Sequence, residues 1–353
     1  MVNAQRRGLA SAAIVALALW AGACGGDDTK DTPSGGDGTR SAEKLLDVNA
    51  KPRDQVMDGG NLRWPLDQFA TQWNFGHLDG MTSATADVVY ALLPYPFPSD
   101  ENANVEPDPD YVTSAEVSSD PKQVVTLKLN PKGKWSNGRA ITWEDYKTQW
   151  QAQRGEDDAY VVSSKTGYER IGNVEMGADE FEVVITFDKP FGDWKSLFVP
   201  LYPKEGMDSA KNYNTFWENK IPITAGPFKL DKIDKSAKTV RIVRDEKWWG
   251  EPAKLDSIIY SAPTLEAQVN AFANGEVDRV NIGADPSSVK RAKQAAGGIV
   301  RVAGGPDFRH FTINGTSPLL QDINVRRALA LAINREAIAK SDLTGLDLSL
   351  IHI

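Results

Sequence analysis

The sequence predicts an α/β fold in which helices are interspersed with strands of mixed pairing. Val125–Leu129 alternates apolar and polar residues as a half-buried strand does. Phe228–Ile233 and Val240–Val243 flank a polar turn, which predicts a β-hairpin. Thr142, with Asp145 three residues later, is a helix-start signal. Together these segments indicate α/β rather than an all-helical or all-strand chain.

Further helices are predicted by the spacing of apolar residues and by capping residues. The helix after Thr142 ends at Gly155, and Phe181–Phe187 and Ile258–Tyr260 are expected to be strands. Two more helices follow, 286–296 and one capped by Thr264; the latter should bury Leu265, Val269 and Phe272 and end at Gly275. The last helical region, 322–340, is capped by Asp322, and its buried face should hold Val325, Ala328, Leu329 and Ala332.

The first 24 residues have the layout of a bacterial lipoprotein export signal. Arg6 and Arg7 precede an uncharged run, Gly8–Ala23, that is shorter than a membrane-spanning helix. Ala21-Gly-Ala-Cys24 resembles the lipobox, although alanine stands where leucine is usual. The resemblance implies a signal peptide over 1–23 and a lipid-anchored Cys24, which is the single cysteine of the chain.

Residues 24–58 are predicted to be a flexible tether. They are rich in Gly, Asp, Ser, Thr and Lys, and no aromatic residue lies between Trp20 and Trp64. Removal of 1–23 takes away two arginines and no acidic residue, so the net charge of −8 becomes −10. An acidic exported protein is not expected to bind nucleic acid, and the length that remains suggests two domains.

Motifs of enzymes fail on their context. Ser119-Asp-Pro-Lys122 and Lys165-Thr-Gly167 match elements of penicillin-binding proteins. The serine should open a helix, but Lys122 leads directly into the strand Val125–Leu129. With three scattered histidines and no phosphate-binding loop, the chain is expected to be no enzyme and to hold no metal or cofactor.

Three separated stretches, taken in order, resemble one family: the extracytoplasmic solute-binding proteins, family 5, of ABC importers. The first, 124–145, reads strand, basic-Gly turn, Trp-Ser-Asn-Gly, and Thr-x-x-Asp helix start. The second begins at Thr224-Ala-Gly-Pro-Phe-Lys-Leu230 and runs to Asn274-Gly-Glu-Val-Asp278. The third contains Phe311-Thr-Ile-Asn314 and Asp322-Ile-Asn-Val-Arg-Arg-Ala-Leu329. The wording is most similar to actinobacterial members.

The resemblance implies a two-lobed, periplasmic-binding-protein-like fold (type II, cluster C) that closes over a solute. Residues 59–262 are expected to form lobe 1 with an inserted subdomain, and 263–343 the start of an incomplete lobe 2. The last residues, 344–353, are expected to be an artefactual tail, because Leu348–Ile353 matches one reading frame of a common sequencing adapter.

The family also implies where a solute binds and what the protein works with. Its first-lobe contacts come from the loop before an early helix, here 74–81 before 85–93. The candidate ligand-binding residues are therefore Asn74, His77, Asp79, Gly80 and Met81. The expected solute is an oligopeptide or a similar small molecule, the expected partners are ABC permease subunits, and a monomer anchored to the outer face of the cytoplasmic membrane is expected. The alternative is a family-5-like lipoprotein with a sensing or envelope-assembly role.

Overall fold

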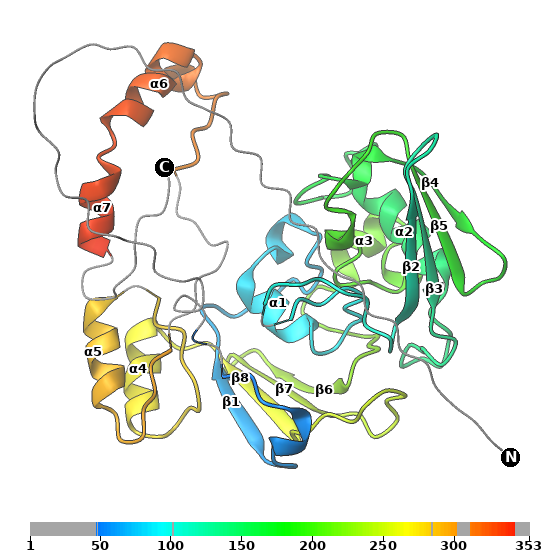
Figure 1. The fold of residues 1–353 in the computed structure, drawn as a ribbon. Coiled ribbons are helices and arrows are strands. Elements are labelled where there is room, and N and C mark those ends of the chain that lie inside the picture. Colours follow the sequence, from blue (N-terminus) through cyan, green and yellow to red (C-terminus); the bar gives the residue numbers. More distant parts are fainter. Residues whose placement is uncertain (1–46, 48, 101, 284, 302–310, 343–353) are drawn as a thin grey trace, which may run out of the picture. The chain divides into compact units, whose positions relative to one another are not determined.

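The structure is a computed structural model that describes residues 47, 49–100, 102–283, 285–301 and 311–342 (Figure 1). The predicted signal peptide, Cys24, most of the tether and the predicted tail fall outside these residues. Within the described ranges, no helix combines the length and apolar character that crossing a bilayer requires.

The described strands form two four-stranded sheets, which confirms the mixed α/β fold class. One sheet has the order β1-β8-β7-β6 and the other β2-β3-β5-β4. Their bounds are β1 Asn61–Pro65, β2 Val112–Ser118, β3 Val124–Leu129, β4 Ile171–Met176, β5 Glu182–Phe187, β6 Phe228–Asp234, β7 Thr239–Arg244 and β8 Ser257–Ser261.

The first sheet joins segments that are far apart in the chain. Strand β1 pairs in parallel with β8, with Trp64 opposite Tyr260, whereas β8, β7 and β6 run antiparallel to one another. The predicted hairpin is confirmed as β6 and β7. The sequence analysis did not expect β1, which is short and ends in proline, because its partner lies almost 200 residues away.

The second sheet is antiparallel throughout and is packed by helix α2, Trp143–Gln153. Val183, Ile185 and Phe187 of β5 are buried, as their alternation predicts. Tyr146 and Trp150 of α2 are buried in the same core. The predicted strand and helix are both present here.

The other helices of the described residues are shorter or less buried. Thr264 caps α4 by accepting from the backbone N–H of Ala267, and Asp322 caps α6 by accepting from Asn324, so both predicted helix starts are confirmed. The bounds are α1 Ser83–Val89, α3 Ala210–Thr215, α4 Leu265–Ala273, α5 Pro286–Gln294, α6 Ile323–Ala332 and α7 Arg335–Asp342.

The predicted buried face of α4 is only partly right. Val269 is buried, but Leu265 is exposed and Phe272 is half-buried. The reason is that Gln268, beside Val269, takes an inward position and donates to the main-chain oxygens of Leu66 and Pro263. The helix is therefore turned so that Gln268 and Val269 face inward.

The single helix predicted over 322–340 is wrong, because the chain divides at Ile333 and Asn334 into α6 and α7. The Asn334 side chain accepts from the backbone N–H of Ala337 and starts a new helix, which is the alternative that asparagine offers the backbone. The face predicted to be buried is exposed as well, since nothing among the described residues packs over it. It comprises Val325, Ala328, Leu329 and Ala332.

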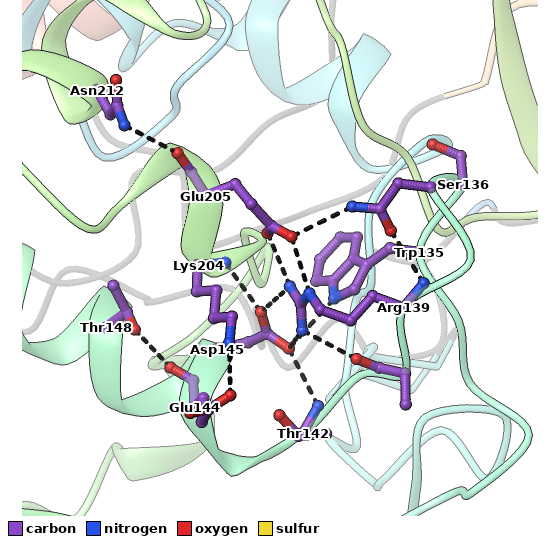
Figure 2. Close-up of polar contacts among 12 residues, drawn as sticks. Trp135, Ser136, Arg139, Thr142, Glu144, Asp145, Thr148, Lys204, Glu205 and Asn212 are labelled. Carbon is purple, nitrogen blue, oxygen red and sulfur yellow. Dashed lines mark hydrogen bonds and ion pairs between the residues drawn. The ribbon is translucent and has the colours of Figure 1, made fainter.

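A buried ion-pair network ties the start of α2 to two loops (Figure 2). Arg139 donates to Asp145 and to Glu205, with N···O distances of 2.6 and 2.8 Å. Asp145 is fully buried and also accepts from Trp135 Nε1 and from the backbone N–H of Thr142 and Lys204. The turn before the network has Gly138 at φ +89°, a conformation that glycine adopts readily. The 135–145 motif is thus a structural clamp.

The predicted lobe boundary at 262/263 stays a prediction, and contacts cross it. Arg63 of β1 forms a two-point ion pair with Asp278, with Nη2–Oδ1 2.6 Å and Nε–Oδ2 3.1 Å. Its Nη1 also donates to the main-chain oxygen of Gly275. The turn after α4 is therefore attached to the first strand of the chain.

Candidate functional site

The loop 74–81 before α1 is anchored to the interior by Asn74. The Asn74 side chain is fully buried, donates to the main-chain oxygen of Tyr213 at 3.0 Å and accepts from the backbone N–H of Gly76 at 3.0 Å. Both ends of its amide are used inside the protein. Asn74 thus shapes the loop and offers nothing to solvent.

His77 is the second internal support of this loop. Its Nδ1 accepts from the backbone N–H of Asp79 at 3.1 Å and so caps the short 3-10 helix Leu78–Gly80. Burial holds the pKa of His77 below its usual value, while the Asp79 carboxylate, 3.9 Å away, opposes that shift. A neutral ring that accepts at Nδ1 carries its proton on Nε2.

Gly80 is required by close packing rather than by a turn. A Cβ at this position would lie 1.9 Å from the main-chain oxygen of Asn74. Backbone cannot move aside as a flexible side chain can. Gly80 therefore keeps the loop folded against its own start.

The solvent-facing residues of the loop are Leu78, Asp79 and Met81. Leu78 is 61% exposed and Met81 54%, and 77% of the Asp79 side chain is accessible. The sequence analysis selected Asp79 and Met81 but not Leu78. Of the five candidate residues, the structure therefore brings two side chains to the surface and uses the other three to hold them.

One side of helix α1 is partly accessible to solvent. Its buried positions are Ala84, Thr85, Val88 and Val89. The opposite positions, Ala86, Asp87 and Tyr90, are half-buried and follow one another at helical spacing. The helical spacing could be predicted from the sequence. The sequence did not show which side of the helix is accessible to solvent, because that depends on the segments that pack against it.

Three aromatic rings group around the end of α1. Tyr90 stacks on Tyr95 with ring centroids 4.7 Å apart, and Phe75 lies edge-on to Tyr90 at 5.8 Å. All three are half-buried. Burial, with smaller effects of Tyr95 and Asp87, raises the pKa of Tyr90 to about 12, so it is a neutral hydroxyl at physiological pH.

A second group joins residues of β1, β8 and the turn after α4 to Asp87. The guanidinium of Arg279 sits 3.9 Å from the ring centroid of Trp64. Trp64 contacts Tyr260 at 5.6 Å, and the Tyr260 hydroxyl donates to the main-chain oxygen of Asp87 at 2.9 Å. Burial raises the pKa of the Asp87 carboxyl, and the positive charge of Arg279 opposes this rise.

We name these side chains the α1 face: Trp64, Phe75, Asp87, Tyr90, Tyr95 and Arg279. They come from β1, loop 74–81, α1 and the residues that follow it, and the turn after α4. Among the described residues, no group hydrogen-bonds to the Asp87 carboxylate or to the Arg279 guanidinium. The face combines aromatic surface with one carboxylate and one guanidinium, which suits binding of a small polar molecule.

The residues that match the penicillin-binding-protein motif do not form a hydrolase site. Lys122 is exposed and pairs with Asp188 at 2.9 Å, and Ser119 follows strand β2 instead of starting a helix. The described residues also contain no group of three His, Cys, Asp or Glu side chains able to hold a metal ion.

Comparison with known proteins decides the family. Residues 106–349 match "Bacterial extracellular solute-binding proteins, family 5 Middle", which is more than half of the chain. The chain belongs to the family 5 extracellular solute-binding proteins. This is a family of binding proteins and not of enzymes, in agreement with the sequence analysis.

The chain is similar to two proteins from Mycobacterium tuberculosis that have different described ligands. The chain is 32% identical to the oligopeptide-binding protein OppA over 338 residues, 94% of this chain and 57% of that protein. It is 26% identical over 254 residues to LpqW, described as a probable monoacyl phosphatidylinositol tetramannoside-binding protein, covering 70% and 39%. The chain thus matches 57% of the length of OppA and 39% of the length of LpqW, less than two thirds of either protein.

Solved structures agree with the fold. The periplasmic EDTA-binding protein EppA has a TM-score of 0.64 at 28% identity, covering 71% of this chain and 48% of that one. The oligopeptide-binding protein AppA from Bacillus subtilis, in complex with a nonapeptide, has a TM-score of 0.65 at 19% identity, with 80% and 56% coverage. The second likeness shows the fold alone.

Proposed function

We propose that this chain is the lipid-anchored, substrate-binding component of an ABC importer that captures oligopeptides or a similar solute. In this proposal, Cys24 carries the lipid anchor, the folded part works as a monomer, and membrane permease subunits receive the solute. The described structure begins well after Cys24, so the anchor rests on the lipobox resemblance.

The observation that carries the proposal is the contrast within loop 74–81. Asn74, His77 and Gly80 are buried and fix the loop, while the side chains of Asp79 and Met81 are exposed to solvent. An exposed methionine supplies adaptable apolar contact. Such a fixed loop with exposed mixed side chains fits a surface that holds many peptide sequences.

The main chain of the loop strengthens this proposal. Its own turns use the N–H groups of His77, Gly80 and Met81, and the Leu78 N–H donates to the main-chain oxygen of Val161, so the loop does not depend on a ligand for its shape. A preformed loop loses little entropy on binding. Tight solute selection then depends on the side chains around it.

Methionine methyl NMR tests the proposal directly. Residues 25–353 carry four methionines: Met57, Met81, Met176 and Met207. Met176 of β4 is 49% exposed, which is close to the 54% of Met81. It lies in the sheet β2-β3-β5-β4 and not in loop 74–81, so it is a matched control. Titration with Ala-Ala-Ala should shift the Met81 methyl signal saturably and leave the Met176 signal in place.

The opposite results are equally clear. No saturable shift of Met81 at millimolar peptide would overturn oligopeptide capture at this loop. Asp79→Ala should weaken the binding read from Met81, whereas Asp179→Ala, at another exposed aspartate, should not. Equal loss in both variants would show that the loop has no special part in it.

A second candidate function is a sensing or envelope-assembly role without transport. The similarity to LpqW across 70% of this chain favours it, because LpqW is described as a probable binding protein for monoacyl phosphatidylinositol tetramannoside and not for a peptide. The genes adjacent to this one separate the two proposals. Permease and ATPase genes in the same operon support import, and their absence, together with no response to Ala-Ala-Ala, would support the second role.

A further inference from the structure

Arg279 stands out on the α1 face because its charge is not satisfied locally. Its side chain is exposed and lies over the Trp64 ring. The neighbouring carboxylate, Asp278, is already held by Arg63 through two N···O contacts of 2.6 and 3.1 Å. Arg279 is therefore left with an aromatic support and no carboxylate of its own among the described residues.

Stacking of this kind leaves the useful edge of a guanidinium open. The ring supports the flat face through a cation–π contact. The five N–H donors lie in the plane of the group, and pairs of them match the two oxygens of a carboxylate. An arginine fixed in this way is prepared to bind an anion from solution.

Asp87 does not remove this capacity. The positive charge of Arg279 acts on the Asp87 carboxyl, but among the described residues the two side chains form no ion pair. Tyr260 bridges the two groups by touching Trp64 and donating to the main-chain oxygen of Asp87. The arrangement keeps a positive and a negative group on one face without joining them.

We propose that Arg279 is a specificity-determining residue of the α1 face and binds a carboxylate of the solute, with Trp64 supporting the guanidinium from behind. This inference rests on the proposed function. It adds the chemical class of the solute, which is a peptide presenting a free carboxylate. It also names the residue, Arg279, that binds this carboxylate.

The dimensions of α1 agree with such a solute. Asp87 lies five residues beyond the cap residue Thr82, about 7.5 Å along the helix axis. An extended tripeptide is roughly 10 Å long. An extended tripeptide is therefore longer than the part of α1 between its cap and Asp87, the carboxylate on which the charge of Arg279 acts.

Three peptides separate the possible sources of the carboxylate. Ala-Ala-Ala carries it at the C-terminus, Ala-Glu-Ala-NH₂ in a side chain, and Ala-Ala-Ala-NH₂ lacks it. With residues 25–353 and the Met81 methyl signal as readout, at least one of the first two should bind about tenfold or more tightly than the last, since a hydrogen bond to a charged group is worth that factor. Whichever acid is preferred identifies the source.

Variants assign the preference to Arg279. Arg279→Gln should abolish the difference between acid and amide, and Arg279→Lys should retain only part of it, because lysine lacks the planar pair of donors. Trp64→Leu should also reduce it. Arg241→Gln, at an exposed arginine of β7 that pairs with Asp231, should leave the difference unchanged.

The outcomes distinguish this inference from the function it rests on. Equal binding of the acids and the amide, or a preference that survives in Arg279→Gln, overturns the role of Arg279 in binding the carboxylate. Peptide capture would still stand. If none of the peptides shifts the Met81 methyl signal, the proposal of peptide capture fails, and the proposed role of Arg279 fails with it. Thermal unfolding of each variant checks that a lost preference does not come from a lost fold.

Discussion

The guanidinium of Arg139 holds the carboxylate of Asp145 at two points, Nη2–Oδ1 at 2.6 Å and Nη1–Oδ2 at 3.0 Å, although Asp145 has no exposure to solvent (Figure 2). The same arginine reaches Glu205 with Nε and Nη2. One side chain therefore connects the turn before α2, the first turn of α2 and the 3-10 helix Lys204–Gly206.

Loss of Arg139 should destabilise the fold strongly. Arg139→Gln removes the charge partner of a buried carboxylate, and we expect the free energy of unfolding to fall by about 3 kcal/mol or more. Urea unfolding followed by tryptophan fluorescence measures it. Lys204→Gln is the control, because it removes an exposed pair with Glu144 that should contribute less than about 1 kcal/mol. Similar losses in the two variants would contradict the clamp.

Stability should fall in mild acid because of His77. Its folded-state pKa is lowered, so the unfolded chain binds the proton more readily. The stabilisation by neutral His77 is complete above the unfolded pKa of about 6.5, and it decreases as the pH drops below that value towards the folded pKa. Urea midpoints at several pH values between 7.5 and 5.5 should show this slope.

The variant His77→Asn isolates this effect. Asparagine can still accept from the backbone N–H of Asp79, but it does not titrate. We expect the decrease in stability between pH 7.5 and 5.5 to become shallower in this variant. An unchanged slope would show that other groups cause the acid sensitivity.

Gly80→Ala should disturb the loop that carries the candidate site. The added Cβ would meet the main-chain oxygen of Asn74 at 1.9 Å, so we expect a loss of about 1–3 kcal/mol, as for overpacked positions. Gly192→Ala is a matched control, since nothing lies within 4 Å of a Cβ there. Thermal unfolding compares them, and a neutral Gly80→Ala would show that the loop adapts freely.

Cys24→Ala should release the protein from the membrane in a bacterial host that processes lipoproteins. Acyl chains contribute roughly 0.8 kcal/mol per buried methylene, so without them the anchor is lost. Fractionation and immunoblotting measure the distribution. Ala21→Leu, which makes the motif more like the usual lipobox, should stay with the membrane. Membrane retention of Cys24→Ala would refute lipidation at this residue.

Local sequence signals predicted elements well where nearby residues decide the structure. Thr264 and Asp322 begin helices by accepting from backbone N–H groups within three residues, and at Thr142 the Asp145 carboxylate accepts from the Thr142 backbone N–H. The hairpin β6–β7 was equally readable. Asn334 carried a local signal too, yet the apolar spacing on both sides of it concealed the break between α6 and α7.

The candidate site was predicted in position but not in detail. The family resemblance pointed to loop 74–81, and Asp79 and Met81 are exposed there. Asn74 and His77 are polar residues in the same loop, and nothing in their local sequence says that one fits under Tyr213 and the other caps a turn. The direction of the Asn74 side chain depends on Tyr213, 139 residues away, and the polar residue types alone do not separate buried from exposed positions.

The sequence by itself determined the family, the α/β class and the places where helices start, because these depend on motif order and on interactions between near neighbours. Only the tertiary structure placed Trp64 beside Tyr260 in the parallel β1–β8 pair and Arg279 over Trp64. It also decided that Arg139 joins Asp145 to Glu205. These contacts join residues distant in the chain, and their pairing is selected by burial and charge in the folded protein, which no local pattern encodes.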